Sequence, residues 1–145
     1  MKKISNQQAL IFKNHLKNFY QKLLGKPCLI EFEFDSFEED WIFRVKKDNV
    51  LTFNLSLFHL CSERFYLCVI IHELYHYIKH KILDKSEVKI LRDLYSDLII
   101  RAMDVEADLY AAIYFKEELN YSYSEYIELL YEGRKVFISK NIRFG

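Results

Sequence analysis

The stretch Val69-Ile70-Ile71-His72-Glu73-Leu74-Tyr75-His76-Tyr77 places a His-Glu-x-x-His motif inside an apolar segment. Four residues turn a helix by about 400°, so His72 and His76 project from one helical face. Both imidazoles can then reach one tetrahedral zinc ion, with Glu73 beside its open coordination position. The segment is too apolar for an outer helix face, and burying three polar groups without a partner is costly. We therefore expect a buried helix with a metal, although a chance triplet on a core helix has the same pattern.

The composition is that of a folded domain. Of 145 residues, 51% are hydrophobic, with 11 Tyr and 12 Phe, which argues against disorder. No apolar run reaches the ~20 residues of a transmembrane helix, and the N-terminal residues 1–8 lack the apolar core of a signal peptide. Cys28, Cys61 and Cys68 have no framework spacing and are expected to be reduced thiols. We expect a single domain, residues 1–145, in the cytoplasm.

Charge is balanced overall and uneven locally. The formal net charge is zero, so neither direct nucleic-acid binding nor membrane binding is expected. Residues 1–30 carry six lysines and no acid, whereas residues 31–40 carry six acids and no base. Two solvated faces of opposite charge explain this distribution, and a basic patch for an acidic partner is the alternative.

Periodicity predicts an α+β fold. Residues 4–24 have helical spacing, and Gly25 and Pro27 end that helix. Residues 28–34 alternate between apolar and polar, which is typical of a strand. Residues 41–45 are a second expected strand. An Asp48-Asn49 turn joins it to a third strand over residues 50–55.

Three helices should follow the strands. Ser62, Ser86 and Ser124 are expected to cap them, with ends near residues 82, 119 and 139. The fold class is therefore an N-terminal helix, a three-stranded and mainly antiparallel sheet, and a zincin-type motif helix followed by two to three helices.

A zinc site needs a third protein ligand. His80 comes too early after the motif for that role, with no intervening glycine, and we expect it to be a solvated end-of-helix residue. Asp104 is the preferred candidate. Glu106 points roughly 200° away from it on a helix and is the second candidate.

The face of Asp104 also carries Ala107, Asp108 and Ala111. The small residues would let this helix approach another one closely. Asp108 could accept the N–H of a ligand histidine and fix its tautomer. The alternative is a solvated acidic stripe, because Asp93 and Asp97 extend the same face.

The chain resembles a known family at two motifs. These are His72-Glu73-Leu74-Tyr75-His76 and Asp104-Val105-Glu106-Ala107-Asp108-Leu109-Tyr110-Ala111. They are similar to the His-Glu-x-x-His and downstream Glu-x-x-Ala-(Asn/Asp)-x-(Phe)-Ala of the ImmA/IrrE-type small gluzincin-like metallopeptidases. The resemblance implies that His72 and His76 bind one Zn²⁺ per chain, that Glu73 is the general base and that Asp108 supports a ligand. Asp104 stands where the family has glutamate, so the helices must lie closer or the metal binds less well.

We therefore expect a zinc metalloendopeptidase that hydrolyses peptide bonds in a specific intracellular protein, for example a regulatory repressor. Zinc would activate a water, and Glu73 would take its proton. The candidate oxyanion donors are Tyr75, Tyr95, Tyr110 and Arg101.

Two other functions are compatible with the sequence. A catalytically degenerate peptidase fold could act as a binding or regulatory module. A structural zinc module could combine Cys61 or Cys68 with His72 and His76, although the spacing matches no common zinc finger. The sequence indicates neither the identity of the substrate nor the oligomeric state.

Overall fold

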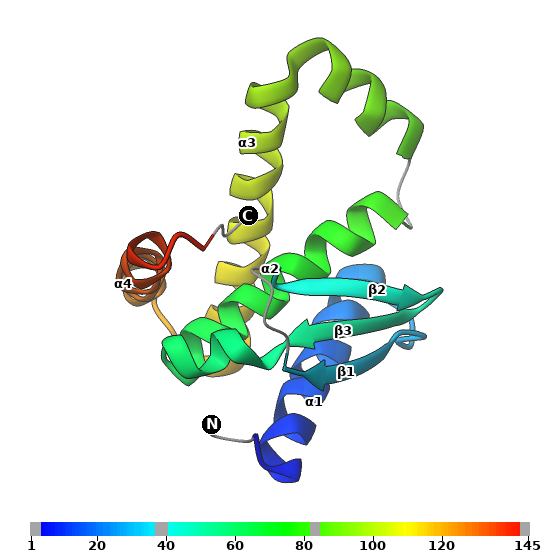
Figure 1. Ribbon diagram of the computed structural model, residues 1–145. Helices are drawn as coiled ribbons and strands as arrows, with labels where there is room; N and C mark the ends of the chain where they lie inside the picture. Colours follow the sequence, from blue (N-terminus) through cyan, green and yellow to red (C-terminus); the bar gives the residue numbers. More distant parts are fainter. Residues whose placement is uncertain (1–3, 37–40, 82–84, 143–145) are drawn as a thin grey trace. The chain divides into compact units, whose positions relative to one another are not determined.

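The structure, a computed structural model, describes residues 4–36, 41–81 and 85–142, and omits the side chains of residues 80–100. The fold is α+β, as predicted (Figure 1). In chain order the elements are α1 (Asn6–Leu24), β1 (Glu31–Asp35), β2 (Phe43–Lys47), β3 (Val50–Asn54), the 3-10 helix η1 (Leu55–Leu60), α2 (Glu63–Lys81), α3 (Lys85–Leu119) and α4 (Tyr123–Ser139). The chain divides into two compact units, the sheet unit (residues 1–70 and 128–144) and the helical unit (residues 71–127).

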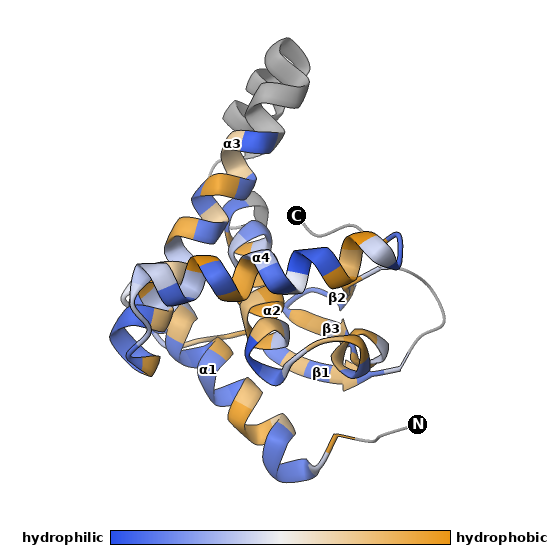
Figure 2. Cartoon of the chain, turned by 90° about the vertical axis from the view of Figure 1, so that its left-hand side faces the viewer, coloured by the Kyte–Doolittle hydropathy of each residue, from blue (hydrophilic) through white to orange (hydrophobic). Residues whose placement is uncertain are grey.

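Helix α1 begins and ends where the sequence indicates. The Ser5 hydroxyl accepts a hydrogen bond from the Gln8 N–H at 3.0 Å and caps the first turn. Gly25, with φ 67°, closes the last turn, and its N–H donates to the Gln21 carbonyl at 2.7 Å. Hydrophobic and hydrophilic residues alternate along the helix (Figure 2), and one side of it is buried. The buried residues are Phe12, Leu16, Phe19 and Tyr20.

The sheet is mixed rather than mainly antiparallel. Strand β3 lies between the other two and pairs antiparallel with β2 through the predicted turn, in which Asn49 has φ 61°. Strand β1 does not pair with its sequence neighbour β2. It lies on the other side of β3 and runs parallel to it. The first two strands also begin a few residues later than expected, at Glu31 and Phe43.

One face of the sheet is aromatic. The Phe53 ring lies 5.8 Å from that of Phe34 and 6.0 Å from that of Phe43, one on each neighbouring strand. Phe12 of α1 packs 6.0 Å from Phe34, so α1 covers this face. Fully burying a side chain such as Phe53 contributes roughly 1.5–3 kcal/mol. The core of the sheet unit therefore lies between α1 and the sheet.

Asn54 links the sheet to the next helices. It is fully buried, and both ends of its amide are satisfied. Its Nδ2 donates to the Trp41 carbonyl at 2.9 Å, and its Oδ1 accepts from the Ser56 N–H at 3.0 Å. Ser62 then caps α2, as predicted, by accepting from the Phe65 N–H at 3.1 Å.

Two predicted caps are wrong. Helix α3 begins at Lys85, so Ser86 lies inside it. Helix α4 is capped by Ser122 instead of Ser124. The Ser122 hydroxyl accepts from the Glu125 N–H and its own N–H donates to the Glu125 carboxylate, both at 3.1 Å. This reciprocal pair is a capping box, which satisfies two backbone donors and therefore prevails over a single Ser124 cap.

Within the described part of the chain, no helix combines the length and the apolar character that a bilayer span requires.

Candidate metal centre

All residues of the candidate centre belong to the helical unit, where α2 and α3 supply them. Leu74 and Ile78 lie on this part of α2, and both are fully buried. The predicted face of α3 carries Ala107 and Ala111, which are also fully buried. Burial of these small residues is consistent with their predicted role on the inner face of α3.

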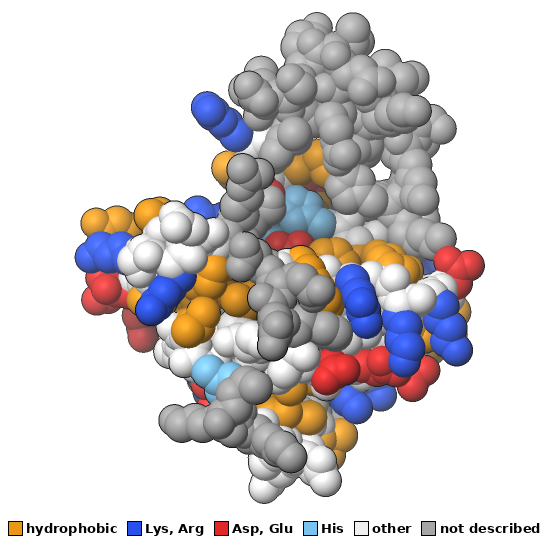
Figure 3. Space-filling model, in the orientation of Figure 1, with side chains coloured by type: hydrophobic (Ala, Val, Ile, Leu, Met, Phe, Trp, Pro, Cys, Tyr) orange, Lys and Arg blue, Asp and Glu red, His pale blue; other side chains and the backbone are white. Residues whose placement is uncertain are grey.

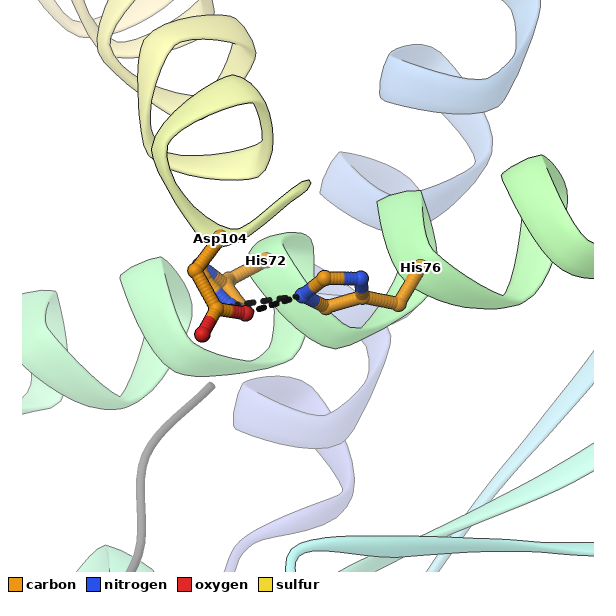
Figure 4. A group of neighbouring side chains, drawn as sticks. All are labelled: His72, His76 and Asp104. Atoms are coloured by element: carbon orange, nitrogen blue, oxygen red, sulfur yellow. Dashed lines mark hydrogen bonds and ion pairs between the residues drawn. The ribbon is translucent and has the colours of Figure 1, made fainter. Parts of the chain in front are cut away.

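The structure brings His72, His76 and Asp104 together (Figure 4). Nε2 of His76 lies 3.0 Å from Nε2 of His72 and 2.9 Å from Oδ1 of Asp104. Nε2 of His72 lies 3.6 Å from the same oxygen. Three potential ligand atoms therefore form a small triangle, although the two helices contribute them from positions 28 residues apart.

The size of this triangle suits a tetrahedral ion. Zinc bonded to nitrogen and oxygen at about 2.0–2.2 Å holds its ligand atoms roughly 3.3–3.5 Å apart. The three observed separations, 2.9, 3.0 and 3.6 Å, lie on both sides of that value. Two imidazoles and one carboxylate are a donor set that catalytic zinc sites use. The residues present therefore fit a zinc ion without a large rearrangement.

Asp108 orients the buried histidine. Its Oδ1 lies 2.8 Å from Nδ1 of His72, and the His72 side chain is 0% exposed. A carboxylate accepts hydrogen bonds, so this contact places a proton on Nδ1. In the neutral ring the lone pair is then on Nε2, the atom that faces His76 and Asp104. This is the support that ligand histidines usually receive from a neighbouring carboxylate.

Charges at the centre favour a cation. Burial lowers the pKa of His72, but hydrogen bonds to Asp104 and Asp108 and the negative charge of Glu73 outweigh it and raise that pKa to about 9. Burial likewise raises the pKa of Asp104, whereas hydrogen bonds and charges from both histidines lower it below its ordinary value. Without a metal, a proton therefore resides among these groups. A divalent cation would take its place.

Glu73 and Glu106 differ in their relation to this centre. Glu73 is buried, at 8% exposure, and is close enough for its charge to act on His72. Glu106, the second candidate ligand, lies outside the cluster. Its carboxylate accepts hydrogen bonds from the Tyr75 hydroxyl and, at 2.9 Å, from Lys79 Nζ. Among the described residues, the group able to hold a metal contains Asp104 and not Glu106.

The oxyanion candidates occupy different environments. The Tyr75 hydroxyl is engaged with Glu106, and the Tyr110 ring stacks on Tyr75 at 4.9 Å between centroids. Arg101 is exposed. Tyr95 lies outside the described side chains, as do His80, Asp93 and Asp97, so the predictions for these four residues stay predictions.

The cysteines lie in the sheet unit and do not belong to the cluster. All three are thiols rather than disulfides. The Cys61 Sγ donates to the Leu57 carbonyl at 3.3 Å, and burial raises the pKa of this thiol to about 12. Cys68 is buried in α2. Among the described residues, the group able to hold a metal contains none of these thiols.

Histidine and acidic side chains appear together at the molecular surface in the space-filling view (Figure 3). The His76 side chain is 14% exposed and that of Asp104 26%, so both reach the solvent. No protein-family model, curated protein or solved structure matches the chain.

Proposed function

We propose that the chain is a zinc-dependent metallopeptidase that hydrolyses peptide bonds in an intracellular protein, in the manner of the ImmA/IrrE-type family that its motifs resemble. His72, His76 and Asp104 would hold the zinc ion. One observation supports the proposal most strongly. Three donor atoms from two helices converge to separations of 2.9–3.6 Å, and one of them is oriented by Asp108.

The donor set supports zinc in spite of the aspartate. The side chain of Asp104 is one methylene shorter than glutamate, yet its Oδ1 lies 2.9 Å from Nε2 of His76. Helix α3 therefore lies close enough to α2 for the shorter aspartate side chain to reach the histidines. A bound zinc ion would supply Lewis-acid polarisation of a carbonyl and lower the pKa of an attacking water.

The remaining residues would divide the acid–base work. Glu73 would accept the proton of the attacking water and pass it to the leaving amine. Its burial and the effect of its charge on His72 support this role. Asp108 would hold the His72 ring through the whole cycle, so that the ring would bind the metal and would not exchange protons.

The partner of the protein under this proposal is a protein or peptide substrate. We place the reaction in the cytoplasm, where the three cysteine thiols are stable.

Zinc content and activity test the proposal together. We expect one zinc per chain, lost in His76→Ala and retained in Cys68→Ala, when the purified protein is analysed by elemental mass spectrometry. Incubation with a proteome-derived peptide library should give cleavage products that are absent with Glu73→Gln, which should still bind zinc. Zinc binding without Glu73-dependent cleavage would favour a binding or regulatory module. Zinc lost in Cys68→Ala would favour the structural zinc module.

A further inference from the structure

A second polar cluster joins α2 and α3 beside the candidate centre. One carboxylate oxygen of Glu106 accepts hydrogen bonds from both the Tyr75 hydroxyl and Lys79 Nζ, the latter at 2.9 Å. Tyr75 and Lys79 are four residues apart, so they lie on one face of α2 in successive turns. A single residue of α3 therefore holds two turns of α2.

This cluster is adjacent in sequence to the proposed ligands. Tyr75 precedes His76, and Glu106 lies midway between Asp104 and Asp108. Two further links join the same helices, from Asp104 to His76 and from Asp108 to His72. The Glu106 links fix α2 independently of the atoms that would bind the ion. They join α2 to α3 at two successive turns of α2.

The Tyr75 side of the Glu106 cluster is buried. Tyr75 is 3% exposed, and its ring stacks on Tyr110 with an interplanar angle of 18°. The stacked ring places the Tyr75 hydroxyl at the Glu106 carboxylate, to which it donates. The Lys79–Glu106 pair is more open, with side chains 28% and 37% exposed.

We propose that Glu106 is a positioning residue, which holds α2 against α3 so that Asp104 stays within reach of an ion bound by His72 and His76. This inference rests on the proposed metal function. Its physical basis is the short aspartate side chain, which cannot follow a displaced helix as a longer one could. Glu106 would act through Tyr75 and Lys79 and would not touch the ion.

Zinc affinity tests this role. In Glu106→Ala we expect one zinc per chain, as in the wild type, but an affinity roughly 10–100-fold lower, measured by competition with a chromogenic chelator. Tyr75→Phe keeps the ring stacking and should weaken zinc binding in the same direction. The matched control is Glu132→Ala, which removes another Glu–Lys pair, with Lys135 at 3.5 Å, from an exposed site on α4. Its zinc affinity should equal that of the wild type.

Three further measurements separate positioning from general stability and from ligation. If Glu106 acts through Tyr75, its removal in the Tyr75→Phe background should cost less affinity than in the wild type. The absorption spectrum of the Co²⁺-substituted Glu106→Ala protein should keep the wild-type band positions, whereas Asp104→Ala should shift them. Gly133→Ala, in which the added Cβ would overlap the ring of Phe65 in the sheet unit, should leave zinc affinity unchanged.

Each contrary result has a distinct meaning. Equal zinc affinity in the wild type and Glu106→Ala would overturn the positioning role alone. A Co²⁺ spectrum altered as in Asp104→Ala would overturn it by making Glu106 a ligand. If Glu106→Ala does not fold, Tyr75→Phe with wild-type affinity would overturn it. Absence of zinc from the wild type would overturn the proposed function, and this inference with it.

Discussion

Nδ1 of His72 lies 2.8 Å from Oδ1 of Asp108, although 36 residues separate the two in the sequence. This pair determines which nitrogen of a fully buried imidazole can donate electrons to a metal. It also ties the motif helix α2 to α3 at the same point. The orientation of the ligand and the contact between the helices therefore depend on one carboxylate.

Replacing Asp108 with asparagine should weaken zinc binding. The amide can still accept a hydrogen bond from Nδ1, but it lacks the negative charge that favours this tautomer and raises the basicity of Nε2. We expect an affinity roughly 10–100-fold lower in a chelator competition assay. Asp35→Asn, on the exposed end of β1, is the matched control and should bind as the wild type does. Unchanged affinity in Asp108→Asn would show that Asp108 does not support a ligand.

The metal-free protein should lose stability as pH rises. The pKa of His72 is raised from 6.5 to about 9 in the fold. The contribution of protonated His72 to the free energy of unfolding is therefore fully present below pH 6.5 and is lost as pH rises through 9. A bound metal replaces this proton, so the increase in melting temperature on adding zinc should be larger at pH 9 than at pH 6.5.

Differential scanning fluorimetry with EDTA or with zinc measures this difference. His72→Gln provides the control, because it should lack both the pH-dependent loss and the response to zinc. A zinc-induced increase that is the same at both pH values would contradict the assigned protonation of His72.

Gly133→Ala should destabilise the sheet unit. Gly133 is buried in α4, and a Cβ at this position would overlap the ring of Phe65. The ring has little freedom to move, since it also packs edge-on against Phe137 at 5.2 Å. We expect a loss of about 1–3 kcal/mol in the free energy of unfolding by urea. The double variant with Phe65→Leu should recover part of it, and equal stability of Gly133→Ala and wild type would refute this packing.

Cys61 should react slowly with alkylating reagents. Burial raises its pKa to about 12 from the ordinary 9.0, so little thiolate exists at pH 8. We expect alkylation by iodoacetamide to be at least about tenfold slower in the folded protein than in urea, as followed by mass spectrometry. Zinc should not change this rate. Protection of Cys61 by zinc would instead support the structural zinc module.

Local patterns predicted much of the fold. Residue periodicity predicts α1 and β1, because burial of one face imposes spacings of 3.6 and 2 residues. It could not predict β2, which is mostly exposed, or β3, which is buried on both faces. The parallel pairing of β1 with β3 was not predicted, since strand order depends on contacts between distant segments. The Ser122 cap differs from the predicted Ser124 cap, although the Ser-x-x-Glu spacing from Ser122 to Glu125 is a recognisable signal for a capping box.

The candidate centre follows the same division. The spacing of His72 and His76 predicts that they share one face of a helix. Helical spacing also places Asp104 and Asp108 on one face with Ala107, which predicts that both aspartates lie near the histidines. The hydrogen bonds of Glu106 to α2 are not predicted from the sequence, because the register between two packed helices cannot be read from the sequence of either helix alone. One sequence feature is compatible with these hydrogen bonds. Tyr75 and Lys79 lie one helical turn apart, and the carboxylate of Glu106 lies two residues beyond Asp104.

Anomalous diffraction at the zinc absorption edge, from crystals of the protein grown with zinc, tests the central claim most directly. We predict one strong peak per chain, bonded to Nε2 of His72, Nε2 of His76 and Oδ1 of Asp104 at about 2.0–2.2 Å. Crystals of His76→Ala should lack this peak. A peak located at the cysteines, or no peak between α2 and α3 in the wild type, would contradict the proposed metal centre.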